Sequence, residues 1–125
     1  MPFIKLSIAR TITPETEDAL VQRLGAALSC VPGKDPQWTI VEVNDGLRLY
    51  FGGVRQEDMV FAEVKYVGHF THQDKRTFTQ RACQTIQEVV GTPMDRICLT
   101  ITEFENWGAL GDLRDIYYVD LPPET

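Results

Sequence analysis

The sequence predicts an α/β fold in which two strand–helix–strand units form one four-stranded mixed sheet, with both helices on one face. Three observations lead to this fold class. Each half of the chain reads as a strand, a helix and a second strand; the second half matches the first at a constant offset; and 125 residues is the size of one domain. We therefore expect a single domain, 1–125, with pseudo-repeats at about 2–58 and 60–111 and a C-terminal segment, 112–125.

The first unit begins with a strand. Residues 4–8 alternate apolar and polar side chains, which is typical of a half-buried strand. Thr13, followed by a proline, predicts a helix start because its hydroxyl can accept from free N–H groups and proline fits the first helical position. Apolar residues then recur at helical spacing until the Pro32-Gly33 pair, where we expect the helix to stop, and residues 38–43 read as the next strand.

The second unit repeats the first at an offset of 58 residues. The offset carries Thr13 onto Thr71 and Gly33 onto Gly91, so the helix start and the glycine after the helix both recur. The matched apolar positions are Ile4, Leu6 and Ile8 with Ala62, Val64 and Tyr66, and Leu20, Leu24 and Leu28 with Phe78, Ala82 and Ile86. Two such units leave one sheet face without helices, so we expect partner subunits to cover it. The tail holds a further strand candidate at 116–119.

Composition and charge exclude several classes of protein. Hydrophobic residues at 43% and charged residues at 24% are typical of a folded globular chain, which excludes disorder. A formal net charge of -6 disfavours a sequence-independent grip on nucleic acid or anionic lipid. Because no apolar run reaches membrane-spanning length and no signal-peptide pattern follows Met1, we expect a cytoplasmic protein without nucleic-acid or membrane partners.

Metal and thiol chemistry have little support in the residues. Cys30, Cys83 and Cys98 are an odd number without CxxC spacing, which favours reduced thiols, and no histidine is placed to activate Cys98. His69 and His72 lie on a loop between strand and helix without a third ligand nearby. We expect no metal site and no cofactor.

Pro2 is the first candidate for chemistry. The offset carries it onto Val60, an ordinary residue within the chain, whereas removal of Met1 would leave Pro2 with a free secondary amine. An α-amine has a reference pKa of about 7.7–8.0, which desolvation or a nearby cation lowers, so such an amine can act as a base near neutral pH. The alternative is a proline that only precedes an edge strand, where a missing N–H costs little.

Lys34 is the second candidate. It stands on the loop between the first helix and the second strand, which we expect to reach the sheet end where Pro2 lies. A lysine there can bind a substrate carboxylate or enolate oxygen and can lower the pKa of the amine by like-charge repulsion. The alternative is a solvated surface charge, the usual state of a loop lysine.

Four short segments together resemble a known family. They are MPFI (1–4), GKDPQW (33–38), LYFGG (49–53) and NWG (106–108). In this order they are similar to the tautomerase superfamily, and to its macrophage migration inhibitory factor branch in particular. The resemblance covers residues 2–108 and implies a homotrimer with sites between subunits. It also implies keto–enol tautomerisation of a small 2-keto acid such as phenylpyruvate, with the amino-terminal proline as general acid and base.

The resemblance also assigns roles by position. Pro2 matches the catalytic proline, Lys34 the pocket lysine, and Val67 a pocket isoleucine near the end of the third strand. Trp38 matches an aromatic wall of the pocket, and Trp107 matches a tryptophan near its mouth.

Two positions depart from the family pattern. Where the branch has a tyrosine and then an asparagine facing the pocket, this chain has Cys98 and Thr100, which we expect to form a smaller and less polar substrate-binding wall. The CxxC of the branch is replaced by Met59 and Ala62, so thiol oxidoreductase activity has no support.

Two alternative functions stay open. Residues 51–56 resemble the cis-3-chloroacrylic acid dehalogenases, which hydrate a haloalkene; Glu105 would then activate water and Lys75-Arg76 would supply cationic charge, although Lys34 stands where that branch has a histidine. The second alternative is a non-catalytic trimeric signalling or binding module.

Overall fold

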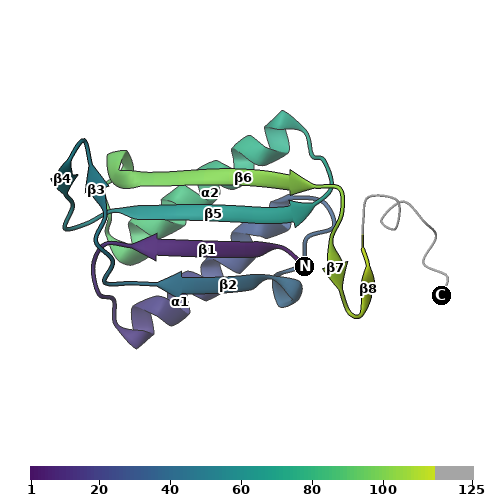
Figure 1. The fold of residues 1–125 in the computed structure, drawn as a ribbon, viewed down its shortest axis with the longest axis horizontal. Helices are drawn as coiled ribbons and strands as arrows, with labels where there is room; N and C mark the ends of the chain where they lie inside the picture. Colours follow the sequence, from purple (N-terminus) through teal and green to yellow (C-terminus); the bar gives the residue numbers. More distant parts are fainter. Residues whose placement is uncertain (115–125) are drawn as a thin grey trace.

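The structure, a computed structural model that describes residues 1–114, is a four-stranded sheet with two helices on one face (Figure 1). The strand order is β2-β1-β5-β6; β1 runs parallel to β2 and antiparallel to β5, and β5 runs parallel to β6. This is the predicted fold class. The strands are β1 (Phe3–Ile8), β2 (Ile40–Asn44), β5 (Val60–Val67) and β6 (Ile97–Phe104), and the helices are α1 (Pro14–Ala27) and α2 (His72–Val90).

The predicted helix starts are confirmed by their hydrogen bonds. The hydroxyl oxygen of Thr13 accepts from the backbone N–H of Thr16 at 3.1 Å, and that of Thr71 accepts from the N–H of Asp74, also at 3.1 Å. Helix α2 ends at Gly91, whose φ of 86° lies in the left-handed region that glycine adopts without steric cost.

The repeat extends to the small elements. A short 3-10 helix precedes the second strand of each unit, and a two-stranded hairpin follows it, again 58 residues apart. These elements are η2 (Pro36–Trp38) and η3 (Met94–Arg96), β3 (Tyr50–Phe51) and β7 (Gly108–Ala109), and β4 (Val54–Arg55) and β8 (Asp112–Leu113). The hairpin of the second unit therefore ends at residue 113.

Two predicted boundaries were wrong. Helix α1 ends at Ala27, and a separate short 3-10 helix, η1 (Leu28–Cys30), follows it before Pro32. The second strand begins at Ile40 rather than at residue 38, because the Asp35 side chain accepts from the Gln37 N–H at 3.0 Å and caps η2 in place of extended chain. The strand candidate at 116–119 lies outside the described residues.

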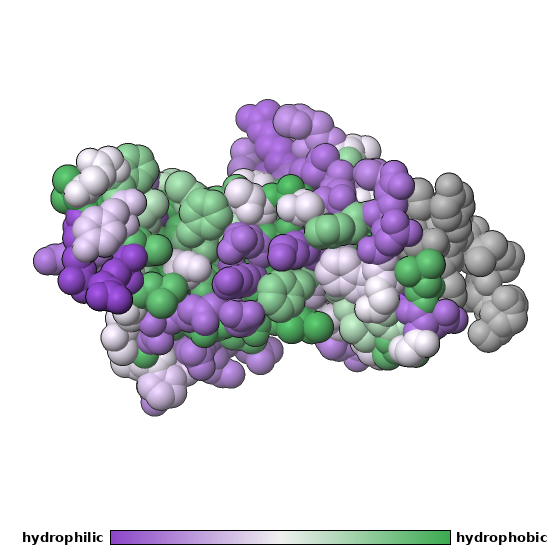
Figure 2. All heavy atoms as spheres, in the orientation of Figure 1, coloured by the Kyte–Doolittle hydropathy of each residue, from purple (hydrophilic) through white to green (hydrophobic). Residues whose placement is uncertain are grey.

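The two faces of the sheet differ in burial. On β1, Ile4, Leu6 and Ile8 are buried beneath the helices, while Phe3 and Lys5 on the opposite face are only half-buried. Over this helix-free face, Figure 2 shows polar and apolar side chains interleaved. The core lies between sheet and helices. It includes Leu20, Leu24 and Leu28 from the first unit, and Val64, Tyr66, Phe78, Ala82 and Ile86 from the second.

Within residues 1–114, no helix is both long enough and apolar enough to cross a membrane. The same residues contain no group of three or more His, Cys, Asp or Glu side chains placed to hold a metal ion.

Candidate active site

A cavity of about 730 Å³ opens at the end of the sheet where β1 begins and β5 ends. The antiparallel register pairs Phe3 with Lys65, so the start of β1 and the end of β5 meet there. Five of the seven site residues predicted from the sequence line this cavity, namely Pro2, Lys34, Trp38, Val67 and Trp107.

The other two predicted site residues lie elsewhere in the chain. Cys98 and Thr100 are on β6, in register with Phe61 and Glu63 of β5, toward the end of the sheet remote from the cavity. Both belong to the helix-free face, because they alternate with Leu99, which packs against the core. Within one chain they do not line the cavity, so they can reach such a site only from another subunit.

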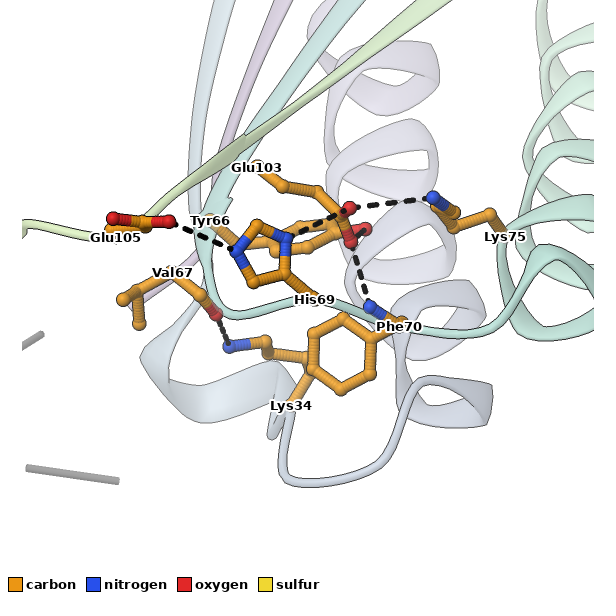
Figure 3. A network of polar contacts seen from close by, with 8 residues as sticks. All are labelled: Lys34, Tyr66, Val67, His69, Phe70, Lys75, Glu103 and Glu105. Carbon is orange, nitrogen blue, oxygen red and sulfur yellow. Dashed lines mark hydrogen bonds and ion pairs between the residues drawn. The ribbon is translucent and has the colours of Figure 1, made fainter. Parts of the chain in front are cut away.

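Lys34 is held against the cavity wall by specific contacts. Its Nζ donates to the backbone carbonyl of Val67 at 3.0 Å and lies 5.2 and 5.3 Å from the ring centres of Tyr66 and Phe70 (Figure 3). Burial lowers the pKa of the Lys34 ammonium from its ordinary value. Lys34 is therefore not the solvated surface lysine of the alternative interpretation.

The N-terminal segment is anchored beside this lysine. The carbonyl of Pro2 accepts from the N–H of Ile40 at 2.9 Å, which extends the β1–β2 pairing to the first residues; Pro2 is buried, whereas Met1 is half-buried. Burial first, and the charge of Lys34 second, lower the pKa of the N-terminal amine. With Met1 in place that amine belongs to Met1, and the Pro2 nitrogen is an amide without a basic lone pair.

A carboxylate network lies behind the cavity wall (Figure 3). Oε2 of Glu103 accepts from the N–H of Phe70 at 2.8 Å and from the hydroxyl of Tyr66 at 3.0 Å, and Oε1 accepts from Lys75 Nζ at 3.3 Å. His69, which lines the cavity, places Nδ1 3.6 Å from Glu103 Oε1 and Nε2 3.7 Å from Glu105 Oε1. The imidazole ring thus stands between two carboxylates.

The electrostatics of the network follow from these contacts. Burial raises the pKa of the Glu103 carboxyl, but the hydrogen bonds from Phe70, Tyr66 and Lys75 outweigh it, so the net pKa is lowered. The pKa of the Tyr66 phenol is raised by burial and by its hydrogen bond to Glu103. Glu103 is therefore an anion, and Tyr66 is a neutral donor, throughout the physiological pH range.

The sequence matches a protein-family model over most of its length. The model describes macrophage migration inhibitory factor (MIF) and matches residues 1–111. The chain belongs to this family. The resemblance that the sequence predicts is thereby confirmed, whereas no curated protein matches the chain in sequence.

Solved structures of MIF and tautomerase proteins share this fold. Leishmania major MIF2 is 18% identical, with a TM-score of 0.82 over 90% of this chain and 97% of that chain. Pt0534 inactivated by 2-oxo-3-pentynoate is 16% identical, with a TM-score of 0.80 over 87% and 93%. A fused 4-OT asymmetric trimer is 16% identical, with a TM-score of 0.81 over 89% and 94%. At these identities the likeness shows the fold alone.

Glu103, which lies beside this cavity, was missed by sequence reasoning. A signal was present, because the offset of 58 carries Asp45 onto position 103 and Ile12 onto Phe70. In the first unit the Asp45 carboxylate accepts from the Ile12 N–H at 2.9 Å, the counterpart of the Glu103–Phe70 bond. An acid at this position therefore ties the chain before each helix to the end of a strand.

The residues of the hydratase alternative are placed differently. Glu105, Lys75 and Arg76 do not line the cavity, and Lys75 Nζ donates a hydrogen bond to Glu103. Glu105 faces His69, and its side chain is 65% exposed.

We predict that Glu103→Gln destabilises the protein in a pH-dependent way. The amide keeps an acceptor oxygen but loses the charge, so the free energy of unfolding at pH 7 should fall by about 1–3 kcal/mol. Because the folded-state pKa lies below the ordinary value of 4.5, the carboxylate's contribution is complete above that pH and is lost as pH falls through the folded-state pKa. Urea unfolding at pH 7 and pH 3 should show the difference from wild type shrinking in acid. Glu105→Gln is the control and should stay near wild type at both pH values; a pH-independent loss in Glu103→Gln would contradict the prediction.

Proposed function

We propose that the protein is a keto–enol tautomerase that acts on a small 2-keto acid such as phenylpyruvate. The observation that carries the proposal is the meeting of Pro2 and Lys34 in one cavity beside aromatic side chains. Once Met1 is removed, Pro2 presents a secondary amine that can exchange a proton with carbon. Lys34 presents a cation for the substrate's carboxylate or enolate oxygen.

The environment of the N-terminus supports a basic amine. The amine of Met1 already has a lowered pKa from burial and from Lys34, and Pro2 is more buried than Met1. The same two influences disfavour the protonated form of an amine at Pro2, which leaves part of it neutral near pH 7. The neutral amine takes a proton from the carbon next to the ketone, and the resulting enolate oxygen is protonated to give the enol.

Aromatic side chains and one relative support the substrate class. Trp38, Phe70 and Trp107 line the cavity and offer apolar surface to a phenyl group. The fold relative Pt0534 is inactivated by 2-oxo-3-pentynoate, which is itself a 2-keto acid. The hydratase alternative has less support, because its carboxylate and cationic residues do not line the cavity.

We further propose that the protein is a homotrimer whose sites lie between subunits. The helix-free face has half-buried apolar side chains such as Phe3 and Phe61, and the hairpins expose Tyr50 and Val54. A trimeric 4-OT structure shares the fold. A neighbouring subunit would bring Cys98 and Thr100 toward the cavity.

The assembly has a direct measurement. Sedimentation equilibrium at micromolar concentration should report about three times the chain mass of 14.2 kDa. A stable monomer would contradict the intersubunit site.

The Pro2 amine can be tested by changing its nitrogen alone. Protein with Met1 removed should convert the phenylpyruvate enol to the keto form with a rate that depends on the ionisation of the amine. Protein with Met1 retained, or with one added N-terminal residue, should lose this activity because the Pro2 nitrogen becomes an amide. Pro2→Gly should keep part of the activity, since glycine still offers an α-amine. Absorbance measures turnover, and intact mass identifies each N-terminus.

Sedimentation is the control for these forms, because each must keep the assembly of the parent protein. Equal activity of blocked and free forms would overturn the amine mechanism. Absence of activity in every form would favour the non-catalytic binding module.

Lys34 should contribute to substrate binding through its charge. Lys34→Ala should lower kcat/KM for phenylpyruvate by roughly ten- to a thousandfold, the range for loss of a charge-assisted contact. Arg76→Ala is the matched control, because it removes an exposed cation outside the cavity and should leave the kinetics unchanged. Unchanged kinetics in Lys34→Ala would show that the lysine has only a packing role.

A further inference from the structure

We propose that His69, oriented by Glu103, is a second proton-transfer group of the cavity and exchanges the proton on the substrate's carbonyl oxygen. This inference rests on the proposed tautomerase function and names a partner for Pro2. Keto–enol conversion moves two protons, one at carbon and one at oxygen. The amine accounts for the first, and nothing assigned so far accounts for the second.

The position of His69 fits this role. It follows β5 directly after Val67 and Gly68, and it lines the same cavity as Pro2 and Lys34. Its Nδ1 faces Glu103, whose side chain is only 16% exposed. At 3.6 Å this contact is longer than a hydrogen bond, but a proton on Nδ1 would face the carboxylate, which leaves the lone pair on Nε2, the arrangement of an oriented histidine base.

The second ring nitrogen is available to a ligand. Nε2 is 3.7 Å from Glu105 Oε1, beyond hydrogen-bonding distance, and the Glu105 side chain is largely exposed. A substrate oxygen can therefore take this position without breaking a hydrogen bond that the fold requires. Contacts of this kind are often long in the ligand-free protein and shorten when substrate binds.

Comparison of the two repeat units distinguishes the structural role of the acid from a chemical role of His69. In the first unit, Asp45 accepts from the Ile12 N–H and so helps to hold the chain before α1. The residue 58 positions before His69 is Thr11, whose uncharged side chain has no imidazole to place beside Asp45. The second unit has the equivalent hydrogen bond, from the Phe70 N–H to Glu103, and it adds His69, which lines the cavity.

The charged groups around the imidazole keep the pair of His69 and Glu103 polarised. Glu103 and Glu105 face its two nitrogens, Lys75 of α2 neutralises part of the Glu103 charge, and Lys34 stands at the same cavity. Glu103 remains an anion because its pKa is lowered, so it stabilises the imidazolium that forms when His69 accepts a proton.

The proton balance is as follows for enol-to-keto conversion. His69 Nε2 takes the enol hydroxyl proton while the C=O bond forms, and the C=C electron pair takes a proton from the Pro2 ammonium. The products are the ketone, an imidazolium and a neutral amine. His69 then gives its proton to water, and Pro2 takes one from water, which restores the starting state. The reverse direction runs through the same groups.

The two histidines of the chain provide a matched test. In protein with Met1 removed, His69→Gln should lower kcat for phenylpyruvate by about a hundredfold, with KM changed by less than about threefold. His72→Gln is the control, because His72 is exposed at the first turn of α2 and does not line the cavity. Glu103→Gln should lower kcat by about tenfold; it acts through His69 as a positioning residue, so the same change in the His69→Gln background should have little further effect.

Added imidazole distinguishes proton transfer from packing. Added imidazole should raise the kcat of His69→Ala about tenfold, and it should leave the kcat of His72→Ala unchanged. Thermal unfolding of each variant checks that the fold is intact.

The outcomes separate this inference from the proposed function. If the N-terminally blocked protein is inactive and His69→Gln keeps kcat within about threefold of wild type, His69 has no proton-transfer role and the tautomerase proposal stands. A rise in KM alone would also overturn the role, because it indicates substrate binding. If wild-type protein with a free Pro2 does not tautomerise phenylpyruvate, both the proposed function and this inference fail.

Discussion

The antiparallel pairing of β1 with β5 is the interaction on which the rest of the molecule depends. Each unit alone has two parallel strands and one helix, too little to bury its apolar faces. The register from Phe3–Lys65 to Ile8–Val60 joins the two sheets, so both helices lie on one face and share a core. The same pairing sets the start of β1 beside the end of β5. The cavity is therefore a consequence of how the two units join.

The two ends of this joined sheet have equivalent backbone structure, but they differ in their side chains and in how deeply these are buried. The offset carries Pro2 onto Val60 and Lys34 onto Thr92, and both residues at the second end are fully buried. Thr92 donates to Asp58 at 2.6 Å, where Lys34 instead reaches a carbonyl at the cavity wall. At one end the chain passes through Met59 into the second unit, whereas at the other end Pro2 lines the cavity. The same backbone arrangement therefore has a packed end at Val60 and Thr92 and a cavity at the end with Pro2 and Lys34.

Much of this arrangement could be predicted from the sequence, because it rests on local or periodic signals. Alternation predicted β1, threonines predicted both helix starts, and the offset predicted that the second unit repeats the first. Trp38 was expected in a strand, because the residues of η2 contain no periodic signal and only the Asp35 cap distinguishes them. The offset places an acid at position 103, but the full Glu103 network could not be predicted, since it depends on Phe70, Tyr66 and Lys75 meeting in space. The proposed approach of Cys98 and Thr100 to the cavity involves a second chain, and the periodicity of one chain says little about how two chains meet.

The tie between an acid and the N–H ahead of each helix has a consequence for how this protein can change over time. At position 45 the carboxylate holds the chain before α1. At position 103 the same bond holds the chain before α2, and the same side chain faces His69. A substitution that removes the carboxylate at position 103 therefore weakens the fold as well as the contact to His69, so the stability of the chain constrains this position independently of any turnover.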